Sequence, residues 1–239
     1  MPTLYQDLSR ELQNTLSLMN PPLAISFSDK PLDQIPAFDD PMPEALPDGR
    51  TGRVSAGCVF WMKAIDRTFS TVEEDHANCS VGSVTHGFKT LEQVSIRSDV
   101  ATIVGAGWVS VEIFPQIPVV TKKFKQVIYG PLAETTMEPD VVFLRVNAKQ
   151  AMIISDALPS LRFEGKPQCH IIAIAKEQKQ VAISVGCMLS RVRTGMSNSE
   201  MTCAIPGEQL PEFVQKLKTS CAIDGTVAAY ASEDAGRFN

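Results

Sequence analysis

Residues 140–158 read DVVFLRVNAKQAMIISDAL, in which a short apolar stretch leads directly into a helical pattern. The stretch 140–146 is rich in Val and Phe and begins after Pro139, which is typical of a β-strand. Asn147 then starts a helix, because Gln150 stands three positions later, as in a capping box. A strand that leads into a capped helix predicts a fold that uses both kinds of element.

The segments on either side carry further patterns of both kinds. Regular apolar spacing indicates helices, whereas runs of Val, Ile and aromatic residues bounded by Gly, Pro and Asp indicate strands. These patterns predict helices over 4–16, 58–69, 90–99 and 207–220, and strands over 22–29, over 125–132 and, as two strands joined by a polar turn, within 169–187. The aromatic residues of 58–69 are also compatible with a strand. Because strands and helices do not alternate strictly, we expect an α+β fold with mixed sheets and flanking helices.

Length and apolar content set the domain organisation. The chain has 239 residues, of which 44% are hydrophobic, and this is enough for a single domain over 1–239. A weak internal repeat divides the chain into pseudo-repeat halves at 20–120 and 121–218, each with a strand that leads to two cysteines. This repeat predicts two related lobes with a site between them.

Residues 29–52 are rich in Pro and Asp, which excludes regular structure over most of this segment. Long segments of this kind commonly carry function. We therefore expect a surface loop or a lid.

Composition excludes several classes of partner. The 22 basic and 27 acidic residues form no basic run that could neutralise a track of phosphates, so nucleic acid is not expected. The longest mostly apolar run, 101–114, is interrupted by Glu112 and is too short to span a bilayer, so no membrane association is expected. The first 16 residues do not resemble a secretory signal. These features predict a cytoplasmic protein, whose six cysteines do not form a disulfide framework.

Four of the six cysteines have distinctive neighbours: Cys58, Cys79, Cys169 and Cys187. Glycines that leave backbone N–H groups free to approach a cluster sulfur or an anion lie close to three of them: Gly57, Gly82 and Gly186. Thiolates favour soft metals and iron–sulfur clusters. The compact C-x-x-C pairs of zinc ribbons and bacterial ferredoxins are absent, so the spacing alone does not identify a metal.

Every histidine lies near a cysteine in the sequence. His76 and His86 flank Cys79, and His170 follows Cys169. A histidine beside a metal-bound thiolate can tune the centre from the outer shell. His76 and His86 are equally compatible with surface polar positions or helix caps.

The segment 186–217, GCMLSRVRTGMSNSEMTCAIPGEQLPEFVQKL, resembles the C-terminal signature of family 169 of the domains of unknown function, an archaeal cysteine-rich group. The matching positions are Gly186, Cys187, Ser190, Arg191, Glu200, Met201, Ile205 and Pro206. Upstream, EPDVVFLRVNAKQAM and NCSVG also resemble family elements, and the resemblance covers roughly 22–217. One departure is CHIIAIA, because many relatives have Cys-Ala-Asp at Cys169.

The resemblance implies a metal or iron–sulfur centre, because the family is cysteine-rich and prevalent in anaerobes. The leading hypothesis is a 4Fe–4S cluster held by the four distinctive cysteines, with Cys203 as the alternative to Cys169 for the fourth ligand. His76, His170 and the three glycines would then lie around it. The hypothesis predicts a redox or electron-transfer role with a redox partner or a small molecule, and an enzyme if one iron is open to substrate.

Three alternatives are left open. The first is a zinc–thiolate protein. The second is a small-molecule or anion-binding module in which Ser190, Arg191 and Arg193 hold an anionic group, because arginine offers a planar fork of donors. The third is thiol catalysis by Cys79 activated by His76. Cys221 is expected to be structural, and the sequence is compatible with a homodimer.

Overall fold

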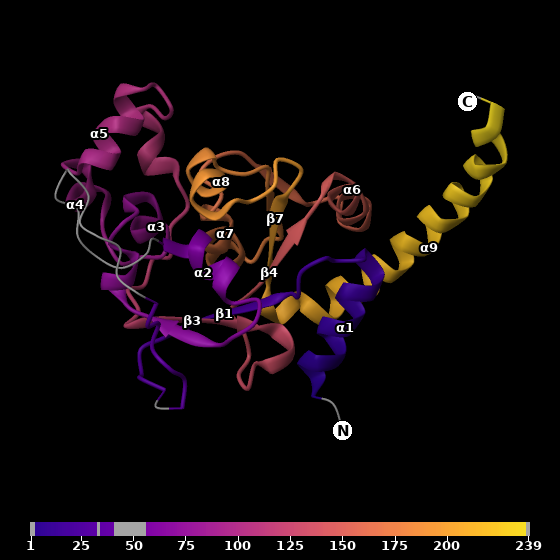
Figure 1. The fold of residues 1–239 in the computed structure, drawn as a ribbon, viewed down its shortest axis with the longest axis horizontal. Coiled ribbons are helices and arrows are strands. Elements are labelled where there is room, and N and C mark those ends of the chain that lie inside the picture. Colours follow the sequence, from indigo (N-terminus) through magenta and orange to yellow (C-terminus); the bar gives the residue numbers. More distant parts are fainter. Residues whose placement is uncertain (1–2, 33, 41–55, 238–239) are drawn as a thin grey trace.

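A seven-stranded sheet runs through the computed structural model, which describes residues 3–32, 34–40 and 56–237 (Figure 1). The strand order is β2-β3-β1-β4-β7-β6-β5, and neighbours are antiparallel except β5 and β6, which are parallel. The strands are β1 (Leu23–Ser28), β2 (Phe69–Thr71), β3 (Gln126–Pro131), β4 (Val141–Val146), β5 (Arg162–Glu164), β6 (Ala182–Ser184) and β7 (Met201–Pro206). This mixed sheet with helices around it confirms the α+β prediction.

Helices cover both faces of the sheet. The α-helices are α1 (Leu4–Leu16), α2 (Ala56–Lys63), α3 (Ser80–Thr85), α4 (Leu91–Ser95), α5 (Ser98–Gly105), α6 (Ala148–Ala157), α7 (His170–Gln178), α8 (Met188–Thr194) and α9 (Leu210–Asp234). Short 3₁₀ helices are η1 (Glu73–His76), η2 (Val111–Gln116), η3 (Leu132–Glu134), η4 (Gly207–Gln209) and η5 (Ala235–Arg237). Within the described ranges, no helix is long and apolar enough to cross a membrane.

Alternation along the strands separates the core into two layers. In β4, Val141 and Phe143 pack with α2 and α7, whereas Val142, Leu144 and Val146 pack with α1, α6 and α9. Successive side chains of a strand point to opposite faces, so a single strand contributes to both layers. The face under α2 and α7 is the one that carries the cysteine-rich helix starts.

The strands form two groups with the same arrangement. In the first group β3 lies between β1 and β2, and in the second β7 lies between β4 and β6. In each group the first strand in the chain pairs with the last: β1 with β3, and β4 with β7. That last strand also pairs with a strand from the middle of the group, β2 or β6. The two groups are joined by the pairing of β1 with β4. β3 completes the first group, although the predicted division after residue 120 assigns it to the second half.

Most predicted elements are present, and two segments differ. The capping box of Asn147 and Gln150 starts α6 as predicted. The first predicted strand of 169–187 is wrong, because 170–178 form α7; only β6 is a strand there. Segment 58–69 contains most of α2 and then the start of β2.

The predicted loop 29–52 is described only in its first part. Phe38 is buried in the core and Ala37 bridges to Ser70 of β2, so this part packs on the sheet. Residues 41–52, on which most of the lid prediction rests, lie outside the described residues.

Candidate functional site

Four cysteines from four helices line one cavity. Cys58 lies in the first turn of α2, and Cys79, Cys169 and Cys187 directly precede α3, α7 and α8. The other lining residues are Gly57, Trp61, Val81, Gly82, Trp108, Pro167, Gln168, Leu189, Ser190 and Arg193. The structure therefore brings together all four cysteines that the sequence singled out.

The strand topology explains why these cysteines meet. Cys58 precedes β2 and Cys79 follows it; Cys169 precedes β6 and Cys187 follows it. β2 and β6 hold matching places in the two groups of strands. Each middle strand thus has a cysteine before it and another after it, and the cavity gathers two from each group.

The other two cysteines lie elsewhere. Cys203 of β7 is fully buried and packs in the core layer on the opposite face of the sheet, beside Leu144 and Ile183. The Cys221 Sγ of α9 donates a hydrogen bond to the Thr15 carbonyl oxygen at 3.4 Å. All six cysteines are free thiols.

The cavity is narrow and mostly apolar. Its atoms leave about 370 Å³ of space, of which only about 20 Å³ is wide enough for the centre of a water molecule. A site for one water needs about 10–15 Å³ by this measure. By this measure the open space between the side chains is about that of one water molecule.

In the absence of a ligand, burial favours the protonated form of three of these thiols. Burial, reinforced by the neighbouring Cys79 thiol, raises the pKa of Cys58 to about 12. Burial likewise raises the pKa of Cys169 well above its usual range. Burial also raises the pKa of Cys187, although backbone N–H groups of Ser190 and Leu189 oppose this. Thiols with raised pKa values are poor nucleophiles, but they lose their protons when a metal binds.

Three residues of the cavity wall carry buried polar atoms without a partner. Trp61 Nε1, Gln168 Oε1 and Arg193 Nη1 are buried and have no hydrogen-bond partner within the described part of the chain. Gln168 is held by its other atom, because its Nε2 donates to Ser190 Oγ at 2.8 Å. Buried polar groups are rarely left unpaired in proteins. Three such atoms in one cavity wall are donors and acceptors that a bound group could satisfy.

The two arginines of α8 have different roles. The Arg191 guanidinium donates to the backbone carbonyl oxygens of Val185, Ser197 and Glu200, so it supports the loops around α8 and does not line the cavity. Arg193 lines the cavity. Burial would lower its pKa, but the adjacent Cys79 sulfur raises it, which favours the charged guanidinium.

The three predicted glycines occupy different positions. Gly57 and Gly82 line the cavity, and the Gly82 N–H donates to Cys79 Sγ at 3.5 Å. A Cβ on Gly57 would lie 2.9 Å from His86 Cε1, so this position has no room for a side chain. Gly186 is not in the cavity wall; its φ of +120° shapes the turn before Cys187.

The histidines are buried, but they do not line the cavity. His76 Nε2 lies 3.0 Å from Thr71 Oγ1, and burial, followed by the nearby His86, lowers the pKa of His76 well below its usual value. His86 Nδ1 lies 2.9 Å from the Gly82 carbonyl oxygen, and burial lowers the pKa of His86 to about 4. His170 Nε2 lies 3.0 Å from Glu164. The surface positions considered for His76 and His86 are therefore wrong.

His76 is not placed to act as a base for Cys79. His76 Nε2 faces Thr71, and its Nδ1 has no hydrogen-bond partner among the residues that are described. A base that activates a thiol must lie within hydrogen-bond reach of it. This geometry does not support thiol catalysis by this pair.

Sequence reasoning missed several lining residues. Trp61 lies three positions after Cys58 on α2, so helical spacing places both on one face and could have identified it. Gln168 directly precedes Cys169, and this adjacency in the sequence could have identified it. Trp108 carried none, because it reaches the cavity only through the fold of the segment after α5.

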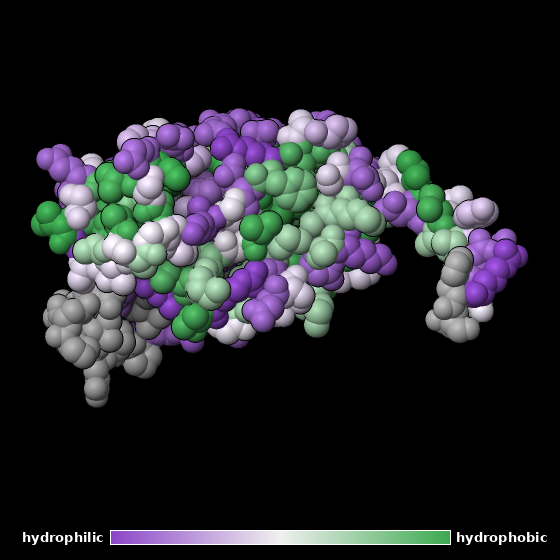
Figure 2. Space-filling view, turned by 90° about the horizontal axis from the view of Figure 1, so that it is seen from above, coloured by the Kyte–Doolittle hydropathy of each residue, from purple (hydrophilic) through white to green (hydrophobic). Residues whose placement is uncertain are grey.

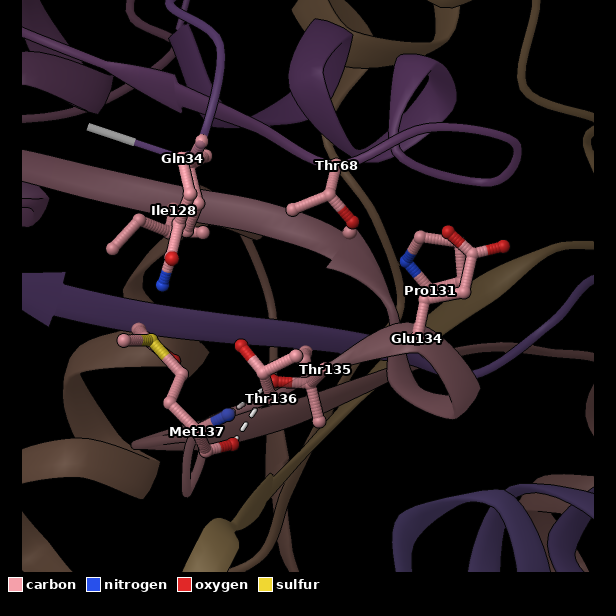
Figure 3. Close-up of a pocket in the computed structure, with 12 residues that line it drawn as sticks. Gln34, Thr68, Ile128, Pro131, Glu134, Thr135, Thr136 and Met137 are labelled. Carbon is pink, nitrogen blue, oxygen red and sulfur yellow. Dashed lines mark hydrogen bonds between the residues drawn. The ribbon is translucent and has the colours of Figure 1, made fainter. Parts of the chain in front are cut away.

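A second hollow lies away from the cysteines and is much wider, with about 400 Å³ open to the centre of a water molecule (Figure 3). Gln34 and Thr68 lie on one side of it and Thr135, Thr136 and Met137 on the other (Figure 3). Glu134 is its one ionisable lining residue among those described. The other polar residues of its lining are uncharged: Ser26, Gln34, Thr68, Thr135 and Thr136.

Comparisons with known proteins agree with the sequence resemblance. No curated protein and no solved structure matches the chain. The model of domain-of-unknown-function family 169, described as "Uncharacterised ArCR", matches residues 11–216. This match includes all four cavity cysteines and every strand of the sheet. The chain belongs to this family of uncharacterised proteins.

Proposed function

We propose that this protein binds an iron–sulfur cluster through Cys58, Cys79, Cys169 and Cys187 and acts in electron transfer or redox chemistry. The observation that carries the proposal is the convergence of four free thiols, from four separate helices, on one buried cavity. Four cysteine thiolates are the usual ligand set of such clusters. Free thiols of this kind suit a reducing compartment such as the cytoplasm.

The same four thiols are the donor set of an iron–sulfur cluster and of a structural zinc ion, and the two centres require different spacings of the sulfurs. Within the described ranges, no three His, Cys, Asp or Glu side chains are close enough to surround one metal ion. Four thiolates around zinc, at about 2.3 Å from the ion, would stand only about 4 Å apart. In a multi-iron cluster the cysteines bind different irons, so their sulfurs are spaced more widely. A zinc–thiolate centre is the second candidate, supported by the same four thiols.

The chain's own residues would hold and tune such a centre. Arg193 supplies a positive charge beside Cys79, and Gly82 donates its N–H to the same sulfur. Trp61, Val81 and Leu189 form apolar walls that limit water. When bound, a cluster supplies one-electron redox chemistry, and nearby donors and burial set its potential.

The unpartnered polar atoms also support a role for this cavity as a ligand site. Trp61 Nε1 and Arg193 Nη1 are donors and are suited to accepting centres such as cluster or thiolate sulfur. An organic anion on Ser190 and Arg191 has less support. The Arg191 fork is occupied by backbone carbonyls, and Ser190 is engaged with Gln168.

Purification without oxygen tests the proposal. The protein should contain iron and acid-labile sulfide and should absorb broadly in the visible range, and air should bleach this absorption. Cys79→Ser should abolish metal loading, whereas Cys221→Ser, a matched change outside the cavity, should retain it.

Two outcomes would count against the iron–sulfur centre. Zinc in place of iron, without sulfide, would leave a thiolate metal site but overturn the cluster. Full metal content in Cys79→Ser would overturn the cavity as the binding site.

A further inference from the structure

The C-terminal part of α9 stands clear of the body of the protein. Residues 222–237 are exposed or half-buried, and the end of the helix projects into solvent (Figures 1 and 2). A Cβ placed on Gly225 would have no neighbour within 4 Å. The family match ends at residue 216, before this segment.

A projecting helix of this composition needs a partner to be stable. Short isolated helices are marginal in water, and most helical stability in proteins comes from packing of an apolar face. Gly225 and Thr226 lower the intrinsic helix propensity further. We therefore expect another surface to pack against one side of this segment.

One side of the projecting helix is apolar. Ile223, Val227 and Tyr230 are 61%, 59% and 71% exposed. They are spaced by four and three residues, so they form one stripe along the helix. Figure 2 shows hydrophobic atoms on this projecting end, apart from the body.

Charged residues continue the stripe in both directions. Lys216 lies seven positions before Ile223, and Asp234 lies four positions after Tyr230. Two local ion pairs mark the ends: Glu212 with Lys216 of α9 at 2.7 Å, and Asp234 of α9 with Arg237 of η5 at 2.9 Å. Along the helix the order is thus acidic, basic, apolar, acidic, basic.

We propose that α9 pairs in an antiparallel manner with α9 of a second copy of this chain, around a two-fold axis level with residue 225. In this register Ile223 meets Val227 of the second copy. Lys216 meets Asp234 of the second copy, because each lies nine positions from the axis. A two-fold interface repeats every such contact.

The charge order selects this partner and this direction. An antiparallel copy places the basic position of one end against the acidic position of the other, whereas a parallel copy would align Lys216 with Lys216 and Asp234 with Asp234. Exposed ion pairs within one helix are weak, so they do not compete strongly with new pairs across the interface. Opposite charges at the flanks of an apolar stripe set direction and register.

Light scattering on the full-length protein, measured over a dilution series, tests the pairing. The wild-type chain should have about twice the monomer mass of 26.1 kDa. Ile223→Asp combined with Val227→Asp should give a monomer. Lys216→Asp or Asp234→Lys should each raise the dimer dissociation constant at least about tenfold, and the combination should restore it. Ser232→Asp, on the opposite side of the helix, is the control and should leave the dimer unchanged.

The rescue makes the register falsifiable. Circular dichroism should show that the combined charge variant keeps its helix content, whereas the monomeric variant should lose no more than the helix of the projecting segment after residue 221. A wild-type monomer at every concentration, or a dimer that survives both apolar substitutions, would overturn the interface. If the combined charge reversals do not restore the wild-type dissociation constant of the dimer, the antiparallel register is wrong.

Discussion

Cys187 and Cys203 lie in one segment of the chain, but the sheet places them in different environments. Cys187 precedes α8 and lines the cavity, whereas Cys203 faces the apolar layer under α6 and α9. If the cavity is the metal site as proposed, Cys187→Ser should lose the metal. Cys203→Ala should keep it and lower the free energy of unfolding by about 1 kcal/mol, as a small core substitution does.

Metal content per folded protein is the measurement for this comparison, with circular dichroism as the control for folding. Equal metal loss in both variants would contradict the assignment. So would full loading of Cys187→Ser, because the cavity would then hold metal without one of its four thiols.

If the cavity holds a cluster as proposed, Arg193 is the lining residue whose charge would bear directly on the reduction potential. Reduction adds negative charge, which a neighbouring guanidinium stabilises. Arg193→Gln should therefore bind a cluster but shift its reduction potential to a more negative value, as measured by a redox titration followed by absorption. Lys218→Gln, at an exposed ion pair with Glu11, removes the same charge elsewhere and should leave the potential unchanged. A potential unaffected by loss of Arg193 would contradict this role.

Three of the four cavity cysteines carry a local signal in the sequence, a glycine close by, whereas Cys169 has none and the segment after it was predicted as a strand. The positions of the surrounding polar groups could not be predicted from the sequence. Arg191 and Arg193 look equivalent in the sequence, but one turns to backbone carbonyls and the other to the cavity. His86 is buried because the fold packs it against Gly57, a contact between residues far apart in sequence.

At the scale of elements, α7 could not be assigned as a helix from its sequence pattern. Residues 170–175 are all buried, so the segment has no polar face to reveal a helical period. A short, fully apolar run cannot be assigned to helix or strand by periodicity alone. By contrast, α6 has a capping box and a mixed face, and its start was predicted correctly.

Gly207 connects β7 to α9 at a point where the chain passes close to the segment before β4. A Cβ there would lie 1.7 Å from the Pro139 carbonyl oxygen, and the Gly207 N–H donates to the Asp140 carbonyl oxygen at 3.0 Å. Gly207→Ala should therefore force the backbone apart and lower the free energy of unfolding by about 2–3 kcal/mol.

Denaturant unfolding would measure this effect. Gly165→Ala is the matched control, because a Cβ there meets nothing within 4 Å, and its stability should change by less than about 1 kcal/mol. Equal stability of the two variants would show that the close approach at Gly207 relaxes without cost.

For the molecule as a whole, the buried histidines make stability depend on pH. The pKa of His86 is lowered to about 4 and that of His76 lies well below its ordinary 6.5, in both cases chiefly because burial disfavours the charged ring. Above pH 6.5 these rings are neutral in both the folded and the unfolded chain. Between pH 6.5 and 4, the unfolded chain binds protons that the folded chain does not, so stability falls as the pH falls.

The expected slope is about 1.4 kcal/mol per pH unit for each histidine, or about 3 kcal/mol from His86 alone by pH 4. Carboxylates with lowered pKa values, such as Glu73 and Glu200, titrate in the unfolded chain mainly below about 4.5, so the upper part of this range reports the histidines. Unfolding of metal-free protein in denaturant at pH 7.5, 6.5, 5.5 and 4.5 would measure the slope. His86→Gln preserves a donor toward the Gly82 carbonyl and removes the titration, so it should flatten the profile by about the share of one histidine. An unchanged free energy of unfolding from pH 7.5 to 4.5 in the wild-type chain would contradict the burial of neutral rings beside the cysteine cavity.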